Sequence, residues 1–167
     1  MRVALNIRCC IAVGILVAGV VSAEGIASAR TEPGSMGVAV PYSHQYCWSL
    51  FFDTISNGCG DVETLDIPIL YEWSGPGGGG WTAMYVNAFG ASANNNVGCQ
   101  AVSVDGVHAT NNLTYWASGY YYLPQFGHTQ TLMLGNGVWV PAQGYEFVTC
   151  QVSPGGQINN IYYEPGW

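Results

Sequence analysis

Apolar and polar residues alternate along much of the chain, and an alternation of period two predicts β-strands rather than helices. The clearest example is the segment 64–73. Every second residue there belongs to one apolar face: Leu65, Ile67, Ile69, Tyr71 and Trp73. Leu70 is the exception, because it is apolar on the otherwise polar face. Pro68 lies in the middle of this strand and indicates a sheet edge or a bulge.

Further short extended runs are separated by residues that favour turns. We expect strands at 81–89, 99–104, 131–134, 138–140, 145–152 and 158–163. Asp105-Gly106 and the segment 135–137 are hairpin signals, and the second predicts that 131–134 pairs with 138–140. The pattern predicts an all-β protein, an antiparallel β-sandwich of immunoglobulin-like or jelly-roll-like type, with a strand order that the sequence leaves open.

The first 29 residues have the features of a secretory signal peptide. Arg2 and Arg8 precede an apolar run at 9–21. This run is shorter than the roughly 20 residues needed to span a membrane. Small residues favour cleavage after Ala29, with Ala23 as the alternative. We therefore expect a secreted protein without a membrane span in the mature chain.

The remaining chain divides into two parts on composition. Residues 30–40 are predicted to form a flexible N-terminal tail, and residues 41–167 a single β-sandwich domain. Most links between the expected strands are short, and we find no internal repeat and no sign of a second domain.

Charge is scarce and mostly negative. The 167 residues include 3 Lys+Arg against 10 Asp+Glu, and Arg30 is the only cation after position 29. Nucleic acid is excluded as a partner, because no basic patch exists to displace counterions from phosphates. The carboxylates of the folded body must therefore be solvated or hydrogen-bonded, and we expect stability at pH 4 to be at least equal to that at pH 7.

Four cysteines follow the leader, and an even number in a secreted domain predicts disulfides. Three connectivities are possible. We favour Cys47–Cys59, which closes a short loop, together with Cys99–Cys150, which ties a middle strand to a late one. A zinc site is disfavoured because the chain has no C-x-x-C pair.

The sequence contains no recognisable catalytic motif. Asp61 and Glu63, on an expected loop, could supply hard oxygen ligands to Ca²⁺, although an acidic solvated turn has the same pattern. A hydrolase would need His108 or His128 within about 3 Å of a carboxylate.

Aromatic residues are the other candidate for function. Tyrosine and tryptophan rings can stack on the CH faces of sugars while neighbouring polar groups bond the hydroxyls. The candidate binding residues are Trp81, Trp116, Tyr120, Tyr121 and Tyr122. The competing interpretation places these rings in the core of a small sandwich.

Three functions remain compatible with these observations. The first is a secreted, non-catalytic binding protein, whose partner is a glycan or another cell-surface component. The second is a self-assembling matrix or coat protein, because low charge and edge strands favour association. The third is a secreted hydrolase with a histidine–carboxylate pair.

Overall fold

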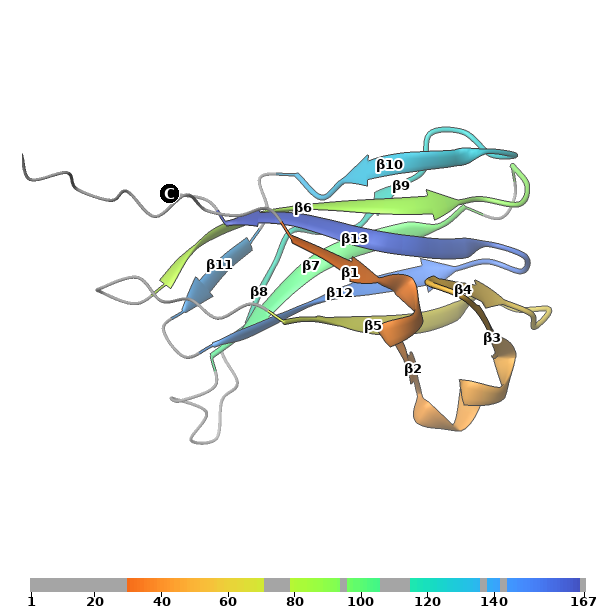
Figure 1. The fold of residues 1–167 in the computed structure, drawn as a ribbon, viewed down its shortest axis with the longest axis horizontal. Coiled ribbons are helices and arrows are strands. Elements are labelled where there is room, and N and C mark those ends of the chain that lie inside the picture. Colours follow the sequence, from red (N-terminus) through yellow and green to blue (C-terminus); the bar gives the residue numbers. More distant parts are fainter. Residues whose placement is uncertain are drawn as a thin grey trace, which may run out of the picture.

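The chain folds into two antiparallel β-sheets that pack face to face as a β-sandwich (Figure 1). The computed structural model describes residues 30–70, 79–93, 96–105, 115–135, 138–141 and 144–165. The predicted all-β, antiparallel and disulfide-linked architecture is confirmed. Residues 1–29, predicted to be the leader, and His108 lie outside the described residues.

The first sheet has seven strands in the order β10-β6-β13-β4-β3, with β1 also along β13 and β11 also along β6. Its strands are β1 (Arg30–Pro33), β3 (Trp48–Phe51), β4 (Thr54–Asn57), β6 (Gly79–Phe89), β10 (Thr129–Met133), β11 (Val138–Pro141) and β13 (Gln157–Pro165).

The second sheet has six strands in the order β2-β5-β12-β7-β8, with β9 also along β7. Its strands are β2 (Val38–Val40), β5 (Glu63–Ile69), β7 (Gly98–Val104), β8 (Tyr115–Ala117), β9 (Tyr121–Tyr122) and β12 (Tyr145–Val152). Two short 3-10 helices, η1 (Gly34–Met36) and η2 (Tyr42–Cys47), carry the chain between the sheets (Figure 1).

The alternation that predicted the strands also builds the core. In β5, Leu65, Ile67 and Ile69 are buried, and β12 buries Val148, Cys150 and Val152 from the facing positions. The seven-stranded sheet supplies the opposite half of the core from alternate residues: Met84, Val86, Ala88, Ile158, Ile161 and Tyr163. Each sheet therefore has one face committed to the core and one outer face free to carry function.

Residues 30–40 were predicted to form a flexible tail, but the structure has two paired strands in this segment. Arg30–Pro33 pairs with β13, and Val38–Val40 pairs with β5 and buries Ala39. Residues 30–33 have no apolar periodicity, so their place in the sheet depends on backbone hydrogen bonds to a distant strand. Val38–Val40 does alternate, and that signal was available in the sequence.

The hairpin predicted between 131–134 and 138–140 is also wrong. Both segments form strands, but β10 and β11 pair with β6 one after the other and not with each other. The reason is length, because β6 has 11 residues and its edge accommodates two short strands. Gly135, with φ of 60°, lies where the chain passes from one to the other.

The two disulfides have the favoured connectivity. Cys47 joins Cys59 across a separation of 12 residues, and Cys99 joins Cys150 across 51. Cys99 and Cys150 are directly opposite each other on β7 and β12. Among the described residues, no helix is both long and apolar enough to cross a membrane.

Candidate functional site

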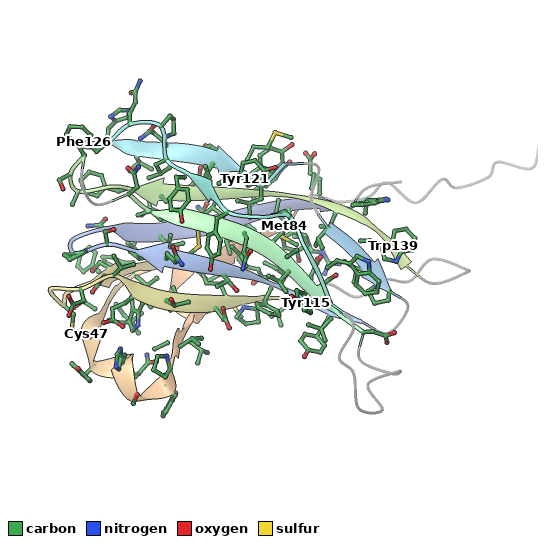
Figure 2. All side chains as sticks on the ribbon, turned by 180° about the vertical axis from the view of Figure 1, so that it is seen from behind. Cys47, Met84, Tyr115, Tyr121, Phe126 and Trp139 are labelled. Atoms are coloured by element: carbon green, nitrogen blue, oxygen red, sulfur yellow. A yellow bond between two sulfur atoms is a disulfide. The ribbon has the colours of Figure 1, made fainter. Side chains whose placement is uncertain are left out.

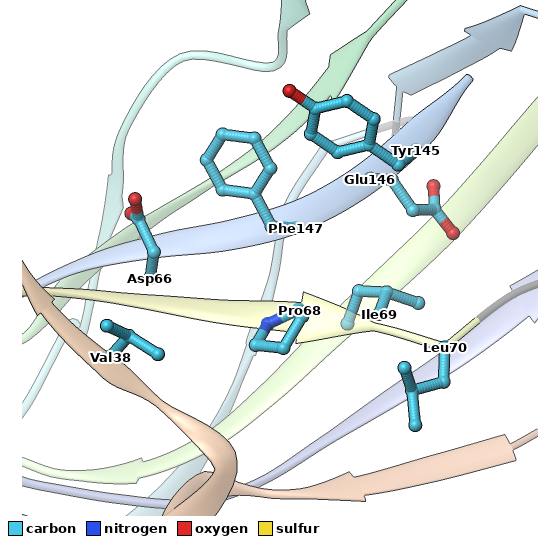
Figure 3. A pocket seen from close by; sticks show the side chains of 8 residues that line it. All are labelled: Val38, Asp66, Pro68, Ile69, Leu70, Tyr145, Glu146 and Phe147. Carbon is cyan, nitrogen blue, oxygen red and sulfur yellow. The ribbon is translucent and has the colours of Figure 1, made fainter. Parts of the chain in front are cut away.

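The outer face of the six-stranded sheet carries a hollow bounded by aromatic and aliphatic side chains. Its volume is about 520 Å³, and the outward side chains around it are Val38, Asp66, Pro68, Leu70, Tyr145 and Phe147 (Figure 3). We call this feature the hollow. It exists because β5 and β12 pair in a register that sets Pro68 opposite Phe147 and Asp66 opposite Thr149.

Two aromatic rings form one wall of the hollow. Tyr145 and Phe147 are two residues apart on β12 and therefore point to the same side of the sheet. Their ring centroids lie 6.4 Å apart at an interplanar angle of 23°. Tyr145 is 54% exposed, so a flat apolar surface faces the solvent next to a phenolic hydroxyl.

A polar row lies beside these rings. Thr149 donates a hydrogen bond of 2.7 Å from Oγ1 to Oδ1 of Asp66. Partial burial raises the pKa of Asp66, and the hydrogen bond from Thr149 acts in the opposite direction. The second oxygen of this carboxyl group can accept a hydrogen bond from a ligand hydroxyl, because each carboxylate oxygen offers two lone pairs.

A second pair of rings lies farther along the same face. Tyr120 and Tyr122 stack with centroids 6.1 Å apart and an interplanar angle of 27°. Tyr122 donates a hydrogen bond of 3.1 Å from its hydroxyl to Oε1 of Gln151 on β12. Burial raises the pKa of Tyr120, and the nearby Tyr122 and Asp66 raise it further.

Gly98 allows the Tyr122 ring to lie flat on the sheet. A Cβ atom at this position would stand 2.2 Å from the Tyr122 ring, which is far closer than real atoms approach. Gly98 is paired directly with Tyr122 across β7 and β9. The glycine is therefore a condition for the second aromatic pair.

We expect Gly98→Ala to lower the free energy of unfolding by about 1–3 kcal/mol, because the added methyl group overpacks against Tyr122. In a Tyr122→Ala background the same substitution should have little effect, since the obstructing ring is gone. Urea unfolding of the four proteins in this double-mutant cycle measures the difference. Equal effects in both backgrounds would show that the ring does not rest on Gly98.

Beneath the hollow, β12 points a carboxyl group into the sandwich. Glu146 is 2% exposed, and neither of its oxygens has a hydrogen-bond partner among the described residues. Burial raises its pKa from 4.5 to about 7, and the neighbouring Thr82 hydroxyl lowers it only in part. Near neutral pH this group therefore holds its proton far more readily than an ordinary glutamate.

The five aromatic residues predicted to bind a ligand do not form one platform. Tyr120 and Tyr122 lie on the outer face of the six-stranded sheet, whereas Trp81 is 49% exposed on the opposite outer face. Trp116 packs partly buried against the core. The hydroxyl of Tyr121 lies over Gly135, where a Cβ atom would approach it to 2.5 Å.

Several residues of the hollow were missed by sequence reasoning. Tyr145 and Phe147 alternate with buried residues on β12, and Leu70 was the exception in the pattern of its strand. An apolar residue on the solvent side of an amphipathic strand was the available signal. What the sequence could not supply was the register that places these side chains together.

The predicted calcium ligands lie in different surroundings. Asp61 is exposed, whereas Glu63 is 6% exposed. One group of potential metal ligands occurs within the described residues and contains Cys47, Cys59 and Glu63, but its two sulfur atoms form a disulfide. The calcium hypothesis stays a prediction.

A histidine–carboxylate pair is present, although not the predicted one. Nδ1 of His44 lies 2.8 Å from Oε2 of Glu63, and this contact fastens η2 to β5. His128 is exposed and has no carboxylate partner among the described residues. The hydrolase hypothesis, which named His108 or His128, stays a prediction.

The sequence matches no family model and no curated protein. Three solved structures show similarity of fold. The C-terminal CBM6 of LamC, a marine laminarinase from Zobellia galactanivorans, has 12% identity, a TM-score of 0.40, and coverage of 82% of this chain and 99% of that one. The CBM22-2 xylan-binding domain of Paenibacillus barcinonensis Xyn10C has 10% identity, a TM-score of 0.37, and coverage of 85% and 86%.

The third similar structure is a Cry1Da tryptic core variant from Bacillus thuringiensis. It has 10% identity and a TM-score of 0.42, and the match covers 82% of this chain but only 23% of that protein. Similarity at this level does not identify a ligand.

Proposed function

We propose that the chain is a secreted, non-catalytic glycan-binding protein whose ligand occupies the hollow on the six-stranded sheet. One observation carries the proposal. The hollow combines the nearly parallel rings of Tyr145 and Phe147 with the carboxyl group of Asp66, which Thr149 holds in place. A sugar needs both parts, because its CH groups stack on a ring while its hydroxyls require polar partners.

The ligand is a neutral glycan rather than an acidic one. Arg30 is the only lysine or arginine within the described part of the chain, and it belongs to β1 of the other sheet. Asp66 is the outward carboxyl group of the hollow, and the buried Glu146 lies behind it. An anionic sugar would meet a carboxylate with no cation to offset the repulsion.

Secretion is supported by the two disulfides, which form and persist in oxidising compartments. The apolar leader expected at residues 1–29 agrees with this location. The carboxyl-rich, nearly cation-free composition also agrees with a protein that works outside the cell and not on nucleic acid.

Tyr145→Ala and Phe147→Ala should each weaken glycan binding about tenfold or more, because each removes a stacking surface from the hollow. Affinity electrophoresis against xylan, mixed-linkage β-glucan and galactomannan measures this loss. Polygalacturonate, an acidic polymer, should not retard the wild-type protein.

Phe126→Ala is the matched control, since Phe126 is an exposed phenylalanine that does not line the hollow. It lies far from Tyr115 (Figure 2), which is a neighbour of the hollow because Tyr115 and Tyr145 are both paired with Val104. The control variant should leave binding unchanged. The proposal is wrong if the wild-type protein binds none of the neutral polymers, or if the hollow variants bind them as strongly as the wild type does.

One observation favours self-assembly as a second candidate. Strand β3 is an edge of the seven-stranded sheet, and the chain exposes Leu50, Phe51 and Phe52 there. An uncharged apolar edge can pair with another chain. Concentration-dependent sedimentation without any polysaccharide would support this candidate, and a constant monomer would support the binding protein.

A further inference from the structure

The outer face of the seven-stranded sheet carries a second aromatic arrangement. Along β6, Thr82, Met84, Val86 and Ala88 are buried, so the intervening residues point outward. In chain order these outward residues are Trp81, Ala83, Tyr85 and Asn87. A small residue therefore lies between two large rings on the same strand.

Each of these two rings lies next to a ring from a neighbouring strand, and the two pairs form two walls. Trp139 of β11 is paired with Trp81, and the rings meet edge to face with centroids 6.1 Å apart at 69°. Tyr162 of β13 is paired with Tyr85, and their centroids lie 5.6 Å apart at 47°. The walls are four residues apart along β6, or about 13 Å of extended chain.

The residue between the two walls is Ala83, which is half-buried and has only a methyl group as its side chain. Ala83 is paired with Glu164 of β13. The Tyr162 hydroxyl donates a hydrogen bond of 2.5 Å to Oε1 of Glu164 and so orients this exposed carboxylate. We call the surface formed by these residues the trough: Trp81, Trp139, Tyr85, Tyr162, Ala83 and Glu164.

Amide and hydroxyl groups continue the surface beyond Tyr85. Asn87 donates a hydrogen bond of 2.7 Å to Asn160 and accepts one of 2.6 Å from Thr131. This network spans three adjacent strands, so its members are held in fixed positions. The uncharged donors and acceptors that remain free on it match sugar hydroxyls.

We propose that the trough is a second glycan subsite, so that one chain holds two neutral polysaccharide strands on opposite faces and bridges them. The proposal rests on glycan binding by the hollow, but its evidence is separate. The occupant follows from charge, because Glu164 is the carboxylate of the trough and repels acidic sugars. A second copy of this chain is disfavoured, since two molecules with net charge −7 would bring their carboxylates together.

The two subsites cannot hold the same sugar unit. The hollow lies on the outer face of one sheet and the trough on the outer face of the other, with the shared core between them. The subsites therefore face away from each other, and each can hold a separate strand of a polymer. Bivalent attachment raises the apparent affinity for a dense polysaccharide surface without any new contact.

Two double variants test this arrangement. Trp81→Ala with Trp139→Ala removes one wall of the trough, and Tyr145→Ala with Phe147→Ala removes the wall of the hollow. Titration calorimetry with cellohexaose and xylohexaose counts the occupied subsites per chain. Light scattering of mixed-linkage β-glucan with added protein reports bridging.

We expect two hexasaccharides per wild-type chain and one for each double variant, with bridging lost in both. Ala83→Tyr, which adds a large side chain between the walls and keeps both walls, should act like the trough variant if removal of the tryptophans disturbs folding. Phe126→Ala should behave as the wild type.

The outcomes separate the two proposals. One hexasaccharide per wild-type chain, with binding unchanged by the trough variants, would overturn the second subsite and leave the hollow intact. No binding by the wild type would overturn both. A dimer in the absence of polysaccharide that the trough variants dissociate would show that the occupant is a second copy and would also overturn the proposal.

Discussion

Removing the disulfide between Cys99 and Cys150 is expected to lower the free energy of unfolding by about 4 kcal/mol, a larger loss than for the bridge between Cys47 and Cys59. The bridge closes a loop between residues 51 positions apart, and such a loop greatly reduces the conformational freedom of the unfolded chain. Both cysteines are fully buried and join the directly paired strands β7 and β12.

The measurement is urea unfolding of the Cys99→Ala, Cys150→Ala double variant at pH 7. The matched control is the Cys47→Ala, Cys59→Ala variant, whose loop of 12 positions predicts a smaller loss of about 3 kcal/mol. The reverse order of the two losses would contradict the loop-entropy explanation. A loss below about 1 kcal/mol for the first pair would show that β7 and β12 hold together without it.

Stability is expected to fall by about 3 kcal/mol as the pH rises from 4.5 to 8, because Glu146 is buried without a partner for its charge. Below pH 4.5 this carboxyl group is protonated in both the folded and the unfolded state and contributes no difference. Between pH 4.5 and 7 the unfolded chain releases the proton first. In this range the folded state holds a proton that the unfolded state has released. The free energy of unfolding therefore decreases with rising pH until Glu146 ionises in the folded state as well.

Glu146→Gln should remove most of this dependence, since an amide resembles the protonated carboxyl group in shape and carries no charge. At pH 8 the variant should be more stable than the wild type by about 2–3 kcal/mol, and at pH 4.5 the two should be nearly equal. Thermal unfolding across this range tests both statements. Asp66 acts in the same direction, because partial burial raises its pKa as well.

Glu164→Gln is the matched control for charge. It removes a carboxylate from the exposed surface and keeps Glu146, so the decrease in stability with pH should persist. A wild-type protein that is less stable at pH 4.5 than at pH 8 would contradict the assignment. This pH dependence agrees with the expectation from the charge count, but the count alone did not identify which residue causes it.

The two outer faces explain why aromatic content was both informative and misleading. Tyr120, Tyr122 and Trp81 are all on the surface, as a binding function requires, yet they belong to opposite sheets. Trp116 fits the competing core interpretation in part, because it is partly buried and packs against the core. Alternation along one strand tells which residues share a face, but it does not tell which strands are neighbours.

The local sequence pattern by itself determined much of the secondary structure of this protein. The alternation of apolar and polar side chains predicted that β5 and β12 belong to a half-buried sheet, because successive side chains of an extended backbone point to opposite faces. The short links rich in turn residues predicted antiparallel pairing. The sequence left three cysteine pairings open and favoured the one that the structure has, from the spacing of Cys47 and Cys59 and from the strands that carry Cys99 and Cys150.

Only the tertiary structure decided which strands, and which side chains, are neighbours. The polar residues 30–33 became a strand because β13 offered unpaired backbone groups, and β10 and β11 share β6 because that strand is long enough for both. The register of β5 with β12 assembled the hollow, and that of β6 with β11 and β13 assembled the trough. Register depends on the summed burial of side chains from segments far apart in the chain, so no local pattern contains it.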